Sequence, residues 1–210
     1  MEKYIFENSY AEFCGEVTKE PIYNHSLGGE DFYTFMAKAM RLSGCIDEIP
    51  ILVSERLVNV YDLKVGTRIN VAGQFRSYNK HENGFKLILN LFALEIEILD
   101  EKQGGLEKNE VFLKGVICRK PVFRTTPLGR NIADCLLAVN RPHNKSDYIP
   151  VIFWGRNARY VSELGVGTTL SISGRIQSRE YTKVLSETES EVRVAYEVSA
   201  KTIELEAEKE

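Results

Sequence analysis

The sequence repeats itself at a shift of one hundred residues, and this repeat constrains the fold more than any other feature. The segment GEVTKEPIY at 15–23 matches GVICRKPVF at 115–123, and EIPILVSER at 48–56 matches YIPVIFWGR at 148–156. A third match, LKVGTRINVAGQFRSY with LGVGTTLSISGRIQSREY, follows after one or two extra residues. Because order and spacing are kept throughout, we interpret the chain as a duplicated domain.

Each copy is predicted to consist mainly of strands. In the second copy, apolar side chains alternate with polar ones over 111–120, 131–141, 148–154, 168–183 and 191–205. A short helical stretch at 156–164 follows the third strand. This order is typical of the OB-fold, a small barrel that binds oligonucleotides or oligosaccharides. We therefore predict an all-β chain of two tandem OB-folds, which are five-stranded barrels, each with a short helix after the third strand.

The repeat also sets the expected domain boundaries, 1–105 and 106–210, with a polar link near DEKQGGLEKN (100–109). The segment 31–44 contains Ala, Met and Lys, which favour a helix. Its repeat partner NIADCLLAVNR has the pattern of a strand, so we predict a strand in both copies.

Several classes of protein are excluded by the sequence. No apolar run approaches the roughly 20 residues that cross a membrane, and the acidic start MEKYIFENSYAEF does not resemble a secretory signal. The expected location is the cytoplasm. The four cysteines and three histidines lack zinc-ligand spacing, and no nucleophile elbow, P-loop or carboxylate pair is evident. We expect no metal, no cofactor and no catalysis.

Positive charge is concentrated in the second copy, although the net charge of the chain is −3. Residues 111–185 contain 12 Lys and Arg against four Asp and Glu, whereas residues 11–85 contain eight against ten. Such asymmetry indicates a nucleic-acid-binding face in the second copy.

Two aromatic residues strengthen this interpretation. Tyr148 and Trp154 alternate with the apolar positions of their strand, and the matching positions of the first copy are Glu48 and Ser54. If the rings were core residues of a shared fold, these replacements would bury a charge and open a cavity. We therefore expect both rings on the surface, where they can stack on unpaired bases.

Basic and aromatic residues on strand faces and in nearby loops suit single-stranded nucleic acid, because cations neutralise phosphates and flat rings stack on bases. An alternative is that the basic strand face is only solvated surface. The candidate DNA-binding residues are Arg119, Lys120, Phe123, Arg124, Arg130, Arg141, Lys145, Tyr148, Trp154, Arg156, Arg175, Gln177, Arg179 and Tyr181.

The second copy resembles the bacterial single-stranded DNA-binding protein (SSB) family. The carrying segments are GVICRKPVFRTTPLGRNIADCLLAVNR, DYIPVIFWGRNARYVSEL, VGTTLSISGRIQSREY and YEVSAKTIEL. The resemblance implies an OB-fold, sequence-tolerant DNA binding in replication, repair or recombination, a nucleoid-associated bacterial protein and no catalysis. It also implies that Tyr148, Trp154 and Tyr181 match the family's stacking aromatics, with Arg175 and Arg179 on its basic strand.

The same resemblance bears on partners. SSB chains commonly carry one OB-fold and form tetramers, so a tandem chain predicts a homodimer with four OB-folds. The sequence stops at IELEAEKE, without the family's acidic-hydrophobic tip, so the usual tail-tip partners are not expected. Two other functions stay open: a replication-restart or mobile-element scaffold acting through protein contacts, and RNA binding on the same surface.

Overall fold

Most of the residues that the structure describes lie in strands, as the alternating pattern predicts. The computed structural model describes residues 8–80, 86–100, 106–184, 186 and 189–206. The strands of the first half are β1 (Ser9–Leu27), β2 (Glu30–Met40), β3 (Ile46–Ser54), β4 (Arg68–Lys80) and β5 (Lys86–Ile98). Those of the second half are β6 (Lys108–Ile117), β7 (Val122–Thr125), β8 (Asn131–Arg141), β9 (Lys145–Trp154), β10 (Thr169–Val184) and β11 (Ser190–Leu205). The expectation of an all-β chain is confirmed.

Period-two burial positions the core. Along β9, Ile149, Val151 and Phe153 are buried, as this parity predicts. The segment with mixed signals, 31–44, forms β2, and its Ala37 and Ala39 point into the core. Ile152 is also buried, so the opposite parity of β9 is partly covered and not fully open to solvent.

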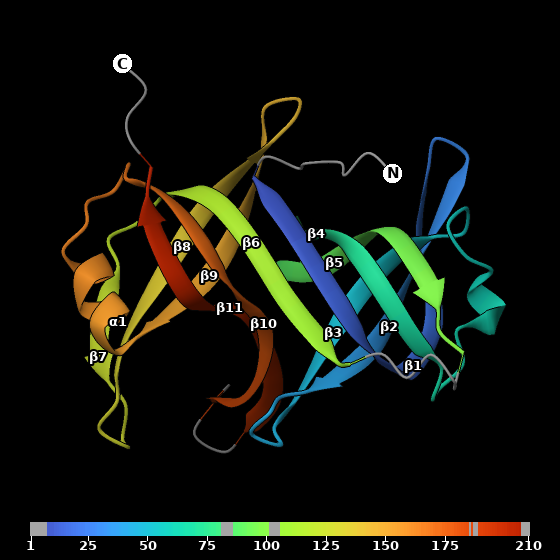
Figure 1. The fold of residues 1–210 in the computed structure, drawn as a ribbon, viewed down its shortest axis with the longest axis horizontal. Coiled ribbons are helices and arrows are strands. Elements are labelled where there is room, and N and C mark those ends of the chain that lie inside the picture. Colours follow the sequence, from blue (N-terminus) through green and yellow to red (C-terminus); the bar gives the residue numbers. More distant parts are fainter. Residues whose placement is uncertain (1–7, 81–85, 101–105, 185, 187–188, 207–210) are drawn as a thin grey trace.

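Each half closes on itself. The strands form one sheet in the order β2-β3-β5-β4-β1-β6-β10-β11-β9-β8-β7, with additional pairings of β2 with β1 and of β6 with β8 (Figure 1). These two pairings join the ends of each half into a ring of strands. β1 and β6 pair along the middle of the sheet, so one hydrogen-bonded sheet runs through both halves.

Three details differ from the pattern expected of each copy. The segment 122–125, predicted as loop, is the short strand β7, which pairs with β8. The second half has the helix α1 (Gly155–Ser162), whereas the first half has only the three-residue 3-10 turn η1 (Val60–Asp62) at the corresponding place. The predicted polar link lies partly in β6 and partly on 101–105, outside the described residues.

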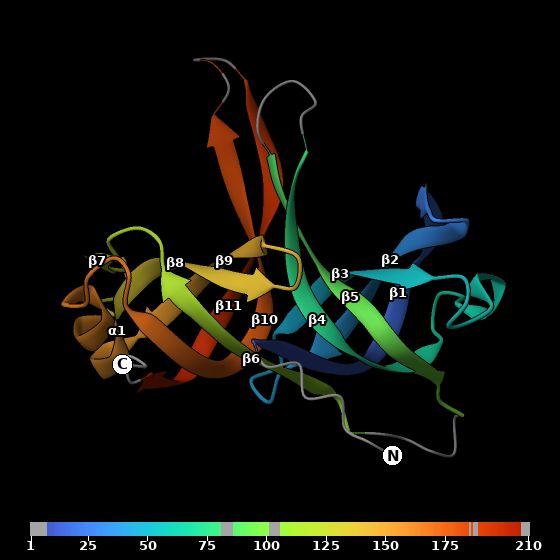
Figure 2. The same ribbon diagram turned by 90° about the horizontal axis from the view of Figure 1, so that it is seen from above.

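A pseudo-two-fold axis relates the two halves. Ala11 of β1 lies opposite Val111 of β6 in an antiparallel pair, and the repeat makes these two positions equivalent. A pair of equivalent positions facing each other is what an isologous two-fold contact requires. The long hairpins β4–β5 and β10–β11 accordingly project in the same direction from one side of the molecule (Figure 2).

The halves also hold each other through a reciprocal pair of buried aspartates. Asp147 accepts the Ser77 backbone N–H at 2.7 Å, and the Ser77 hydroxyl accepts the Tyr148 backbone N–H at 2.7 Å. The equivalent contacts, both at 3.2 Å, join Asp47, Ser178 and Glu48. No helix among the described residues is long and apolar enough to cross a membrane.

Candidate nucleic-acid interface

A row of side chains crosses the second half on one face of its sheet. Cross-strand partners share a face, and the register pairs Arg124 with Ile132 and Ile132 with Trp154. One strand further, Ser199 lies opposite Arg175. The strands β7, β8, β9, β11 and β10 therefore place these residues along one stripe, with Trp154 near its centre.

This stripe borders a groove of about 1330 Å³ between the two halves. Five candidate residues line the groove, namely Arg130, Trp154, Arg175, Gln177 and Arg179. Further cations line it as well, Arg41 from the first half and Lys108 and Lys201 from the second. The groove is large enough for several nucleotides and not matched to one small ligand.

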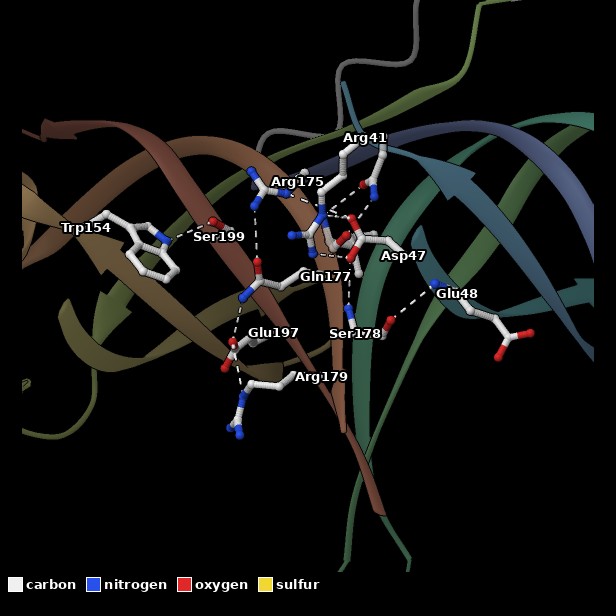
Figure 3. A network of polar contacts seen from close by, with 12 residues as sticks. Arg41, Asp47, Glu48, Trp154, Arg175, Gln177, Ser178, Arg179, Glu197 and Ser199 are labelled. Carbon is white, nitrogen blue, oxygen red and sulfur yellow. Dashed lines mark hydrogen bonds and ion pairs between the residues drawn. The ribbon is translucent and has the colours of Figure 1, made fainter. Parts of the chain in front are cut away.

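Trp154 is held in place at the edge of this groove. Its indole Nε1–H donates a hydrogen bond to the Ser199 hydroxyl at 3.0 Å (Figure 3). The side chain is partly buried, and it directly follows the buried residues of β9. A ring fixed in this way loses little conformational freedom when a base stacks on it.

Tyr148 occupies a different place. It is 43% exposed, as predicted, but it does not line the groove. Its backbone N–H reaches Ser77 of the first half, so it lies at the junction between the halves. The structure therefore brings Trp154 together with Arg130 and Arg175, and it leaves Tyr148 as a separate exposed ring.

A carboxylate lies within the predicted basic face. Gln177 donates to Glu197 at 2.6 Å and accepts from the Arg175 guanidinium at 3.3 Å, and Arg179 lies 4.0 Å from Glu197 (Figure 3). Gln177, a candidate DNA-binding residue, is only 6% exposed and is held within this network, although it borders the groove.

Asp47 adds a second carboxylate from the other half. Arg41 grips it through two hydrogen bonds at 2.6 and 2.5 Å, and Arg175 lies 3.9 Å away (Figure 3). Burial and the neighbouring Arg41 lower the pKa of Arg175, although Asp47 opposes this shift. Arg41 is thus the closer cation to Asp47, and Arg175 keeps 38% of its side chain exposed beside the groove.

Two further candidate cations are paired within the second half. Arg124 donates to both carboxylate oxygens of Asp134, at 2.5 and 3.1 Å, and this hydrogen bonding raises the pKa of Arg124. Arg141 lies 2.8 Å from the fully buried Asp147. Ion pairs of this kind compete with phosphate for the guanidinium.

The remaining basic candidates have no ion-pair partner among the described residues. They are the exposed side chains Arg119, Lys120, Arg130, Lys145 and Arg156. Because phosphate neutralisation needs accessible cations, these five residues form the readily available positive charge of the second half.

Two aromatic candidates lie outside the groove. Phe123 pairs with Ala133 on the opposite face of β7 from Arg124, and it borders a smaller pocket with Arg159 and Glu163 beside α1. Tyr181 is exposed on the β10–β11 hairpin, 5.9 Å from the guanidinium of Arg179. The structure thus separates Phe123 from the stripe that contains Trp154, and it places Tyr181 further along the β10–β11 hairpin.

Asp47 and Glu197 were missed by sequence reasoning. A signal existed for Asp47, because Arg41 and Asp47 recur as Arg141 and Asp147 at the shift of one hundred. Glu197 lies beyond the basic stretch 111–185, so its contact with β10 depends on strand register. Among the described residues, no group of three or more His, Cys, Asp or Glu gathers as metal ligands.

Comparison with known proteins finds a family match over the second half of the chain. A model described as "Single-strand binding protein family" matches residues 108–205. A single-stranded DNA-binding protein of Halalkalibacterium halodurans is 38% identical over 80 residues, which cover 35% of this chain and 48% of that protein. One from Deinococcus radiodurans is 28% identical over 142 residues, which cover 58% of this chain and 47% of that protein. The chain thus spans about half the length of these curated relatives.

A solved structure resembles nearly the whole chain. The wild-type single-stranded DNA binding protein of Thermus aquaticus has a TM-score of 0.77 at 22% identity, covering 96% of this chain and 94% of that one. A deletion mutant of the same protein has a TM-score of 0.72 at 24% identity, with 96% and 95% covered. At such identities the likeness bears on the fold alone.

Proposed function

We propose that the chain binds single-stranded DNA without sequence preference, because residues 108–205 match the model of the single-strand binding protein family. Its role is to cover exposed strands during replication, repair or recombination, by binding and without catalysis. The observation that carries this proposal is the groove where Trp154 lies in one row with Arg175 and close to Arg130.

The proposed domains are a degenerate OB-fold over 1–105 and an SSB-like OB-fold over 106–210. The additional pairings of β1 with β2 and of β6 with β8 support two separate barrels. OB-folds bind nucleic acid on a sheet face flanked by loops, and the stripe through Trp154 has this position.

In the proposed binding mode, Trp154 and Tyr148 stack on bases and the accessible cations neutralise phosphates. Arg130, Arg175 and Arg179 act within the groove, and Tyr181 extends the contact along the hairpin. Gln177 has a positioning role, because it links Arg175 to Glu197. The remaining candidates do not line the groove, and they contact the DNA on either side of it. They are Arg119, Lys120, Phe123, Arg124, Arg141, Lys145 and Arg156.

The second half is proposed to provide most of the affinity. Its segment 111–185 has three times as many basic as acidic residues, whereas 11–85 has fewer basic than acidic ones. We also propose that two chains form a homodimer with four OB-folds. RNA can use the same stacking row, so competition between matched RNA and DNA oligomers decides the preferred strand.

The test is a fluorescence titration of the protein with oligo-dT, since Trp154 is the single tryptophan of the chain. Stacking of a base on the indole is expected to quench its emission in a saturable way. An emission that stays constant while the oligonucleotide is in excess would contradict the proposal.

A pair of variants assigns the binding to one half. Trp154→Ala should weaken oligo-dT binding by about tenfold, the loss of roughly one base–ring stack. Tyr78→Ala, which removes a 43% exposed ring of β4 in the first half, should weaken it less. A labelled oligonucleotide reports both affinities. The opposite order would show that the first half provides most of the affinity.

A further inference from the structure

The first half carries a row of stacked side chains that alignment of the repeat does not reveal. The His25 ring stacks on Phe32 with centroids 4.9 Å apart and planes at 6°. Phe32 lies 6.1 Å from Phe92, and the Arg76 guanidinium lies over the Phe92 ring at 3.8 Å. These four residues come from β1, β2, β5 and β4, so the row crosses the whole half.

Strand register places this row on the face that corresponds to the Trp154 stripe. Phe92 of β5 lies opposite Leu52 of β3, and Ser199 of β11 lies opposite Ile152 of β9. Since 52 and 152 are repeat-equivalent positions, Phe92 is the equivalent of Ser199. The shift is 107 here and not one hundred, because the two hairpins differ in length.

On the strands next to β5 and β11 the two halves again differ in where the aromatic ring lies. Phe32 of β2 lies opposite Ser54, and Ile132 of β8 lies opposite Trp154. The second half thus has one large ring at the centre of its stripe with small or aliphatic neighbours. The first half has a serine at the centre with a phenyl ring on either side. The aromatic rings therefore lie on different strands in the two halves.

The chemistry of the row suits unpaired bases. His25 is exposed and Phe92 is partly exposed, and bases stack on aromatic rings and on guanidinium planes alike. Gln74 accepts hydrogen bonds from Arg76 at 3.0 and 2.6 Å, which fixes the guanidinium over the ring. In the second half, Arg175 and Gln177 form the same pair in reversed order.

The row also ends at the junction between the halves. Burial and the nearby Arg141 of the second half lower the pKa of Arg76 to about 10, while Asp147 opposes this shift. Arg76 therefore remains a cation at neutral pH. Arg175 lies beside Asp47 and Arg41, although its repeat equivalent is Gln74 and not Arg76, so an arginine from each row reaches the interface with the other half.

We propose that His25, Phe92 and Arg76 form a second binding surface for single-stranded nucleic acid, on which bases stack, while Phe32, which is only 8% exposed, supports the His25 ring. The proposal rests on the proposed function and extends it to the first half. This surface binds more weakly than the groove, because residues 11–85 carry ten acidic and eight basic residues. A long strand occupies both surfaces, whereas a short one occupies only the groove.

The experiment compares wild type with Phe92→Ser, which installs the residue of the second half at this position. The probes are oligo-dT of about 8 nucleotides, which fits one OB-fold, and of about 30 nucleotides, which spans two. The variant should bind the short probe as wild type does, with normal Trp154 quenching. It should bind the long probe at least about fivefold more weakly, the lower limit for one lost base–ring stack. Equal affinity of both proteins for the long probe would overturn the proposal.

Phe92→Leu is the matched control, because it keeps an apolar side chain at the position and removes only the ring. It should reproduce the loss for the long probe while its circular dichroism stays that of wild type. Photo-crosslinking of wild type to long iodouracil-substituted DNA gives a result that needs no variant. Crosslinks at His25 or Phe92 support the second surface, and crosslinks confined to residues 106–210 overturn it.

The two proposals fail in different ways. If wild type binds neither probe and Trp154 emission is unchanged, single-stranded DNA binding itself is wrong. If the short probe quenches Trp154 normally and the long probe gains nothing from Phe92, only the second surface is wrong.

Discussion

Two aspartates show how strongly the contact between the halves is specified. Asp47 and Asp147 are fully buried, and each accepts a backbone N–H from the opposite half while an arginine of its own half lies against it. A buried carboxylate is costly unless it is paired and hydrogen-bonded. Burial raises the pKa of Asp147, although the Ser77 N–H and Arg141 oppose the shift. These residues therefore fix the relative position of the halves.

The cysteines give a residue-scale prediction. Burial raises the pKa of the Cys135 thiol to about 12, whereas Cys45 is exposed. Since the thiolate is the reactive form, a thiol reagent at pH 8 should label Cys45 rapidly and Cys135 only after denaturation. Peptide mass spectrometry of the labelled protein checks this.

The sign follows from the higher pKa in the folded state. The contribution of Cys135 to stability is fully present below pH 9, the ordinary pKa of a cysteine thiol. This contribution is lost as the pH rises from 9 through about 12, the pKa in the folded state. Cys45→Ser should remove the rapid labelling and leave the rest unchanged. Native labelling of Cys135 as fast as Cys45 would show that its burial is wrong.

At the scale of elements, a bulge in each long hairpin shapes the binding stripe. The register of β10 with β11 shifts between Ser173 and Gly174, and β4 with β5 shifts at Gly73. A Cβ atom on Gly174 would lie 2.2 Å from the Ser199 carbonyl oxygen. Glycine is therefore required where the two strands approach closely beside the partner of Trp154.

Gly174→Ala should lower the free energy of unfolding by about 1–3 kcal/mol, because the new methyl group forces β10 and β11 apart. Chemical denaturation measures this change. Gly165→Ala is the control, since a Cβ there meets nothing within 4 Å. Equal stability of the two variants would mean that the strands tolerate the separation.

Much of this fold follows from patterns that the sequence contains. The repeat predicts β2 as a strand against its local composition, and parity predicts the buried residues of β9 and the exposed Tyr148. Such patterns predict only features that depend on residues close together in the sequence. The strand β7 and the burial of Gln177 depend on which strands become neighbours, and alternation within one strand does not encode that.

The cations and the aromatic rings of the candidate site could be predicted from the sequence. The carboxylates that pair with these cations could not be predicted as well. Trp154 and Arg175 lie together as expected. Ion pairs with Asp47, Asp134, Asp147 and Glu197 were not foreseen, since each joins separate strands and two of them involve the first half or the end of the chain. The repeat does not reveal Phe92, because the longer second hairpin moves the equivalent position away from the shift of one hundred.

At the scale of the whole molecule, the two halves form one pseudo-symmetric body with unequal surfaces. The β1–β6 pairing and the reciprocal aspartates join them, and the groove contains residues from both. Duplication within one chain allows each half to change independently. One half has accessible positive charge while the other has a stacked row and an acidic balance, a difference that a homodimer of identical single-domain subunits could not have.

The most direct test of this account is the salt dependence of binding to labelled oligo-dT. Each phosphate neutralised on a single strand contributes about −0.7 to the slope of log K against log salt concentration, so the accessible cations with Arg175 and Arg179 predict a slope between about −3 and −5. Arg130→Ala, which removes one cation at the groove, should make that slope less steep by about 0.7. A slope near zero, or one that Arg130→Ala leaves unchanged, would contradict binding of single-stranded DNA in this groove.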